Sequence, residues 1–205
     1  MNVYTRIFLL LMVGCFTTVN SQNHKELKTN EEVTMKKNVL VVYLTRSNNT
    51  EAVANMITEK IDGDVFEVKP EKPYASNYQK NVDEVKFQND HNILPPLSAT
   101  IDISEYDAIF VGFPTWGMQL PPPIKTFLSQ NNWEGKTVVP FNTNAGYGLG
   151  SSISQLNKYC QNAIVTDAFS VKGGHEREGI LFVMKGKKAT EVSNLLDAWL
   201  QKIGF

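Results

Sequence analysis

Two apolar runs in the chain, at residues 39–44 and 108–113, are continuous rather than alternating. Strands buried on both faces of a parallel sheet have this pattern, because no position along them faces water. Shorter runs at 65–68, 137–141 and 163–165 complete a set of five predicted strands. Pro140 has no N–H to donate to a sheet ladder, so we expect it at the end of its strand.

Helical patterns lie between and after these runs. Apolar residues at intervals of three and four predict helices with one buried face. Four such stripes are present: Ala52, Val53, Met56 and Ile57; Ile124, Phe127 and Leu128; Ile153, Leu156 and Cys160; and Val192, Leu195, Leu196, Trp199, Leu200 and Ile203. Strands that alternate with helices at this spacing predict an α/β fold with a doubly wound, five-stranded parallel sheet.

Two segments of the chain have a weaker pattern. Residues 74–89 could form a helix, although its apolar positions are sparse, and two consecutive prolines at 95–96 would close it. Residues 180–184 fit either an edge strand or the start of the last helix, since periodicity over five residues does not distinguish the two. In the polar loop before them, we expect His175 to be solvated.

The first 21 residues have the pattern of a signal peptide. Arg6 precedes a ten-residue apolar run at 7–16, which is too short to span a bilayer. Cleavage before Gln22 is one possible processing step, and the other is lipid attachment at Cys15, because the residues around it resemble a bacterial lipoprotein signal. The alternative is a buried N-terminal strand or helix. Residues 22–36 are polar and predict a linker to a domain at 37–205.

The N-terminal segment therefore predicts export, to the periplasm or to a membrane through a lipid anchor at Cys15.

The composition of the chain limits the classes of function that it can have. The 20 Lys and Arg nearly balance 21 Asp and Glu, so no excess positive charge favours a nucleic-acid partner. Two cysteines are too few for a structural zinc site or a disulfide framework. No metal site or catalytic side chain is predicted, and any redox chemistry would come from a bound cofactor.

The loop after the first predicted strand leads directly into a helix. In an open parallel sheet, ligands bind beyond the carboxyl ends of the strands, which is where this loop lies. Backbone N–H groups at a helix N-terminus, together with hydroxyl donors, suit a phosphate monoester. The candidate phosphate ligands are Thr45, Arg46, Ser47, Asn48, Asn49 and Thr50. The alternative is that Ser47 or Asn49 only caps the helix.

Two further loops follow later strands. The second loop contains Pro114, Thr115, Trp116 and Gly117, and the loop at 45–50 is called the first loop below. Turns lie at the surface, so the indole of Trp116 is a candidate stacking platform, the alternative being that it packs under its own loop. The third loop contains Asn144, Ala145, Gly146, Tyr147 and Gly148. Together the three loops predict a site for a flat heterocycle with a phosphate tail.

These loops resemble those of the flavodoxin-like family, and more closely its short bacterial FMN-binding branch. The resemblance rests on TRSNNT at 45–50, PTWG at 114–117 and TNAGYGLG at 143–150, and it covers residues 37–205. It implies strand order 2-1-3-4-5 and FMN as cofactor, with the phosphate in the first loop and the ring between Trp116 and Tyr147. A peptide group at Gly117 would contact the flavin N5. The family usually has Gly where this chain has Asn48, and Asn tolerates left-handed geometry.

The resemblance implies an FMN-binding electron-transfer protein that serves a redox partner protein or a small-molecule acceptor. One alternative is an FMN-dependent NAD(P)H:quinone oxidoreductase, and another is a flavodoxin-fold binding module without redox turnover. Typical electron-carrier flavodoxins are strongly acidic, whereas this chain has a net charge of -1. Stacking of both Trp116 and Tyr147 on the ring would leave no open face for a nicotinamide, so we expect direct NAD(P)H oxidation to be slow.

Overall fold

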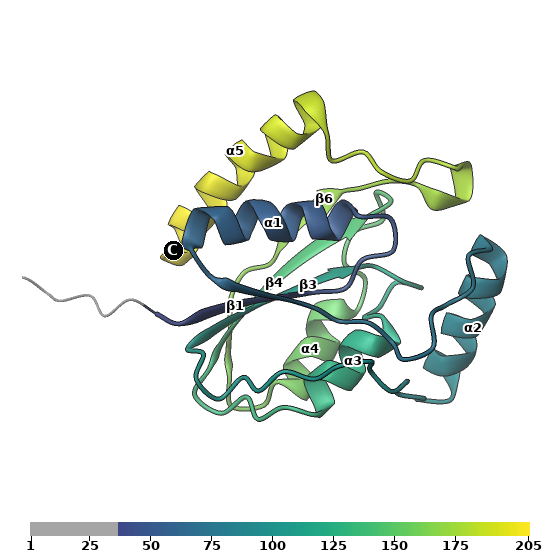
Figure 1. Ribbon diagram of the computed structural model, residues 1–205, viewed down its shortest axis with the longest axis horizontal. Coiled ribbons are helices and arrows are strands. Elements are labelled where there is room, and N and C mark those ends of the chain that lie inside the picture. The colour runs from purple at the N-terminus through teal and green to yellow at the C-terminus, as the bar shows by residue number, and fades with distance from the viewer. Residues whose placement is uncertain (1–36) are drawn as a thin grey trace, which may run out of the picture. The chain divides into compact units, whose positions relative to one another are not determined.

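The computed structural model describes residues 37–205 (Figure 1). The predicted signal peptide, lipid-attachment site and linker lie outside these residues. In chain order the elements are β1 (Val39–Tyr43), α1 (Asn49–Ile61), β2 (Asp64–Glu67), α2 (Tyr78–Asp90), β3 (Ala108–Pro114), α3 (Pro122–Ser129), β4 (Thr137–Asn144), α4 (Ser152–Tyr159), β5 (Ile164–Val165), β6 (Phe169–Lys172), the 3-10 turn η1 (Glu176–Glu178) and α5 (Gly186–Ile203).

The strands are parallel and lie in the order β2-β1-β3-β4-β5, which confirms the predicted α/β class and strand order. Helices cover both faces, with α1 and α5 on one and α3 and α4 on the other (Figure 1). Alternate residues of β1 enter the two cores: Val41 packs with α1 and α5, and Leu40 packs with α3 and α4. The apolar pattern of β1 is therefore continuous because both faces of this strand are buried, as predicted.

The far edge of the sheet differs from the prediction. Both β5 and β6 pair with β4, so one interrupted edge strand lies beside it. Pro140 lies inside β4 rather than at its end, and that expectation was wrong. The N–H of Thr166 donates to the carbonyl oxygen of Val138, so even-numbered residues of β4 face this edge. The N–H that Pro140 lacks therefore falls where the edge strand is interrupted.

The helical stripes are confirmed except at one position. Val53 and Ile57 of α1 are fully buried, and in α5 the buried face consists of Val192, Leu196, Trp199 and Leu200. Leu195 is 55% exposed, which contradicts its predicted core position. Intervals of four and three between the buried residues of α5 already make a complete stripe, and Leu195 falls at its border.

The two segments with weaker patterns resolve differently. Residues 78–90 form α2, which begins four residues later than predicted because the Asn77 side chain accepts a hydrogen bond from the Lys80 N–H and caps the helix. Residues 181–185 are neither strand nor helix, and α5 begins at Gly186. Tertiary hydrogen bonds from Asn49 hold that segment extended, and no local pattern encodes them.

Within residues 37–205, no helix has both the length and the apolar character that crossing a bilayer requires. The same residues contain no group of three or more His, Cys, Asp or Glu side chains placed to hold a metal ion.

Candidate functional site

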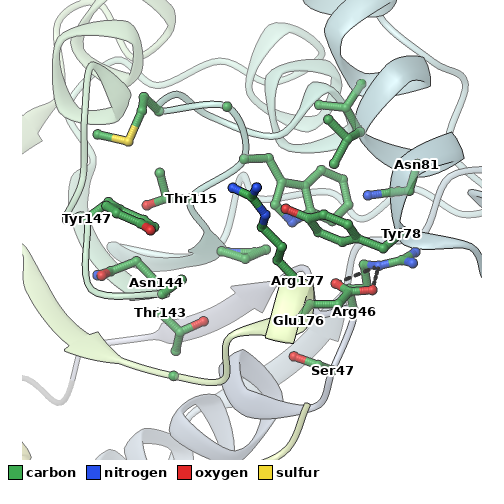
Figure 2. Close-up of a pocket in the computed structure, with 18 of the residues that line it drawn as sticks. Arg46, Ser47, Tyr78, Asn81, Thr115, Thr143, Asn144, Tyr147, Glu176 and Arg177 are labelled. Carbon is green, nitrogen blue, oxygen red and sulfur yellow. Dashed lines mark hydrogen bonds and ion pairs between the residues drawn. The ribbon is translucent and has the colours of Figure 1, made fainter. Parts of the chain in front are cut away.

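A cavity of about 650 Å³ opens beyond the carboxyl ends of β1, β3 and β4, and residues of α2 and η1 also line it (Figure 2). All three predicted loops reach it. The predicted site residues that line it are Arg46, Ser47, Asn49, Thr50, Pro114, Thr115, Trp116, Gly117, Asn144, Ala145 and Tyr147. The other four predicted site residues, Thr45, Asn48, Gly146 and Gly148, belong to the same loops but do not line the cavity.

The backbone of the first loop forms the floor of the cavity. Asn48, the N-cap of α1, has a φ of 61°, the left-handed conformation expected at a position where the family usually has Gly. Its side chain makes no capping hydrogen bond, and neither Ser47 nor Asn49 is the cap. The N–H groups of residues 46–51 have no acceptor elsewhere in the described chain. These unpaired donors at the start of a 13-residue helix can bind an anion.

The Thr50 and Asn49 side chains of this loop make hydrogen bonds to other parts of the protein. The hydroxyls of Thr50 and Thr143 lie 2.9 Å apart in a buried hydrogen bond that joins the first loop to β4. Asn49 is 3% exposed; its Nδ2 donates to the carbonyl of Leu181 at 2.6 Å, and its Oδ1 accepts from the N–H of Val183 at 3.0 Å. The Asn49 side chain therefore fixes the segment before α5, and only its backbone N–H remains available to a ligand.

Arg46 connects three parts of the cavity wall. Its Nε lies 2.8 Å from a carboxylate oxygen of Glu176 in η1 (Figure 2). Its Nη1 and Nη2 each donate, at 3.0 Å, to the carbonyl oxygens of Ala75 and Ser76 just before α2. Three of the five guanidinium N–H groups are thus bound by protein acceptors, which makes Arg46 a clamp between the first loop, η1 and the chain before α2.

Trp116 of the second loop is half-buried. Its indole lines the cavity and also packs edge-on against Tyr74, with ring centroids 5.3 Å apart. Burial raises the pKa of Tyr74, whose hydroxyl donates to Gln88 Oε1 at 2.6 Å. Gly117, with a φ of 57°, makes the tight turn in which Trp116 and Gln119 exchange backbone hydrogen bonds. Trp116 thus both lines the cavity and packs against the hydrophobic core.

Asn144 organises the third loop. Its Oδ1 accepts from the N–H of Gly146 at 2.8 Å and from that of Gly148 at 3.1 Å. These two glycine N–H groups therefore bind the Asn144 side chain. The loop projects Tyr147, which is 68% exposed, so the ring has room to move over a bound ligand.

Sequence reasoning missed the remaining walls of the cavity. One face of α2 lines it, and so do the residues that follow β6. His175 was expected to be solvated, but its side chain is 20% exposed, lies 2.9 Å from Glu178 and contacts the Tyr147 ring at 6.1 Å between centroids. A Cβ on Gly174 would lie 2.0 Å from the carbonyl oxygen of Leu181, so only a glycine permits the backbone at residue 181 to lie this close to residue 174. The interval between Tyr78, Val82 and Val85 was the available signal for α2.

Comparison with known proteins agrees with this arrangement. A sequence model of the flavodoxin family matches residues 38–181. The chain belongs to the flavodoxin family. No curated protein sequence matches it.

Solved structures of other flavodoxin-like proteins are similar. A flavoprotein of Lactobacillus acidophilus NCFM, solved in complex with FMN, is 28% identical, covers 65% of this chain and 93% of its own, and has a TM-score of 0.59. A candidate flavoprotein of Bacteroides eggerthii is 24% identical, covers 82% of this chain and 99% of its own, and has a TM-score of 0.67. The second likeness supports the fold alone.

Proposed function

We propose that the cavity binds FMN and that the protein transfers electrons through it. The observation that carries this proposal is the row of unpaired N–H groups at residues 46–51, at the positive end of α1. A phosphate monoester would satisfy them. The FMN-bound flavoprotein of Lactobacillus acidophilus supports the assignment, as do the aromatic side chains of Trp116 and Tyr147 in the same cavity.

Each loop would have a separate role in holding the cofactor. The first would bind the phosphate, mainly through backbone donors, because Arg46 and the Asn49 side chain are engaged elsewhere. Trp116 and Tyr147 would flank the ring, and the Gly117 peptide would contact N5. The bound FMN supplies one-electron and two-electron redox chemistry, while these residues bind and orient it.

The shape of the cavity favours a small-molecule acceptor over a protein partner. It extends past the three loops to the face of α2, which gives a second molecule a place beside the ring. Among the charged side chains that line it, Arg46 pairs with Glu176 and Lys86 with Asp90, while Arg177 lies outside these pairs. No single-sign patch of the kind that guides a protein partner results from these pairs.

Absorbance and stopped-flow spectroscopy test this function. The purified protein should carry a flavin spectrum after incubation with FMN, and a protein without one would be a binding module of another kind. Mixing the loaded protein with NADH or NADPH should bleach the flavin slowly. Rapid bleaching at micromolar nucleotide would instead identify an NAD(P)H-dependent oxidoreductase.

We also propose that the protein is exported, from the apolar run at 7–16 behind Arg6. Mass spectrometry of the protein from its native host should find a chain that begins at Gln22, or a lipid-modified chain that begins at Cys15. An intact N-terminus in the cytoplasmic fraction would contradict export.

A further inference from the structure

The cavity has a second wall that the three loops do not supply. Residues of α2 spaced by three and four line it, among them Tyr78, Val82 and Val85. Figure 2 shows Tyr78 and the neighbouring Asn81 on the side of the cavity opposite Tyr147 and Asn144. Lys125 Nζ joins this wall to the second loop, since it donates at 2.8 Å to Asn89 Oδ1 and also at 2.8 Å to Gln119 Oε1. We call the part of the cavity next to this wall the compartment under α2.

Asn81 is the polar group at the centre of this wall. It is 4% exposed, and its Oδ1 is buried without a hydrogen-bond partner in the described part of the chain. The residue lines the cavity, and its amide points from α2 toward the interior (Figure 2). Buried polar groups in folded proteins almost always have partners, so an unpaired buried amide at a cavity wall indicates a ligand group that completes it.

Arg177 supplies an available charge over the same compartment. Of the arginine and lysine side chains that line the cavity, Arg46 is paired with Glu176 and Lys86 with Asp90. Arg177 has no acceptor or carboxylate partner among residues 37–205. Its guanidinium extends across the cavity in Figure 2, between Thr115 and Tyr78 and away from Ser47 in the phosphate loop. It is therefore placed to meet a negative group other than the FMN phosphate.

We propose that the compartment under α2 binds a flat aromatic molecule that carries an anionic group. Tyr78 and Val85 would contact the ring, and Arg177 would pair with the charge. Asn81 Oδ1 would accept a hydrogen bond from a donor on the edge of the ring. The inference rests on the proposed function, because it takes FMN to fill the part of the cavity between the phosphate loop and Tyr147. It adds the class of molecule that is held beside the flavin.

Calorimetric titration of the FMN-loaded protein with 6-hydroxy-2-naphthoate and with 6-hydroxy-2-naphthamide, called naphthoate and naphthamide below, tests the compartment. These probes share one shape and a hydroxyl donor for Asn81 Oδ1, and they differ in charge. Wild type should bind naphthoate more tightly. Arg177→Gln should weaken naphthoate about tenfold and naphthamide about twofold at most. Asn81→Leu should weaken both probes, and the isosteric Asn81→Asp should weaken naphthoate most. Lys80→Gln, which removes an exposed charge of α2 outside the cavity, is the matched control.

The outcomes separate this inference from the proposed function. Retention of FMN with no naphthoate binding, or with equal affinity in wild type, Arg177→Gln and Asn81→Leu, would overturn the compartment alone. Displacement of FMN by naphthoate would also overturn it, because the probe would then occupy the flavin position. Failure of the wild type to take up FMN would contradict the proposed function, and titration of the unloaded protein would still test Arg177 and Asn81.

Discussion

The two sides of the cavity are held in place by different forces. On the loop side, Asn142 is fully buried and its Nδ2 donates to the Phe113 carbonyl and to Thr115 Oγ1, while Thr50 and Thr143 share a buried hydrogen bond. On the α2 side, Arg46 joins the elements through a partly exposed ion pair with Glu176 and through hydrogen bonds to the carbonyl oxygens of Ala75 and Ser76. Buried hydrogen bonds cost much to break, whereas exposed ion pairs contribute little.

This difference suggests a division of work. The loops that would hold the cofactor are fixed before it binds, so little ordering is required on binding. The α2 and η1 wall can open and close at low cost, as entry of a second molecule requires. Substitutions on the loop side should therefore change global stability, and substitutions on the α2 side should change local opening.

Asn142→Ala should give the largest effect. It removes a side chain that satisfies several buried polar groups, and we expect it to lower the free energy of unfolding by about 3 kcal/mol. Urea denaturation followed by circular dichroism measures this as a lower midpoint. Asn157→Ala, at an exposed position of α4, is the control and should stay within about 0.5 kcal/mol of wild type. A small effect at Asn142 would remove the contrast between the two sides.

Asn49→Ala should lower stability by about 2 kcal/mol, because Leu181 and Val183 lose their partners on the first loop. Amide hydrogen exchange followed by mass spectrometry should show faster exchange in residues 181–185. Unchanged exchange there would mean that this segment is held by its apolar contacts instead.

Glu176→Gln should cost only about 0.5 to 1 kcal/mol of global stability, since the ion pair with Arg46 is partly exposed. Hydrogen exchange in residues 75–78 and 174–178 should nevertheless rise, and added salt should have the same effect on wild type. A loss of stability as large as that of Asn142→Ala would show that the α2 wall is as rigid as the loops.

Asn48→Gly should have the smallest effect, within about 0.5 kcal/mol of wild type, because the position already has a left-handed backbone. Asn48→Ala should cost about 1 kcal/mol, since alanine tolerates that conformation less well. Thermal unfolding of the pair separates them, and equal melting temperatures would show that the loop relaxes around residue 48.

The sheet and the three loops could be predicted from sequence because their signals are local. Apolar runs such as 39–44 and 108–113 encode buried strands, and loops at their carboxyl ends must meet at one edge. The chain conformation at residues 181–185 could not be predicted, because Asn49 fixes it from more than 130 positions away. Leu195 fits the helical period equally well and is left outside the core only by the packing of α5.

The α2 wall of the site was missed for the same reason. Glu176 meets Arg46 across 130 positions of sequence, and nothing near either residue identifies the other. Arg46 is predicted as a phosphate ligand because it lies in the loop, and in the structure three of its guanidinium N–H groups bind Glu176 and the chain before α2. Residue type and position thus located the loop correctly, while the role of this side chain depended on the tertiary fold.

The most direct test of the phosphate site compares the affinity of the unloaded protein for FMN and for riboflavin, which differ only in the phosphate. Fluorescence titration under matched salt should give FMN an affinity about a hundredfold higher, since hydrogen bonds from the N–H groups of residues 46–51 to a charged phosphate contribute about 3 kcal/mol together. Equal affinity for the two flavins would contradict the central claim that this loop holds the cofactor by its phosphate.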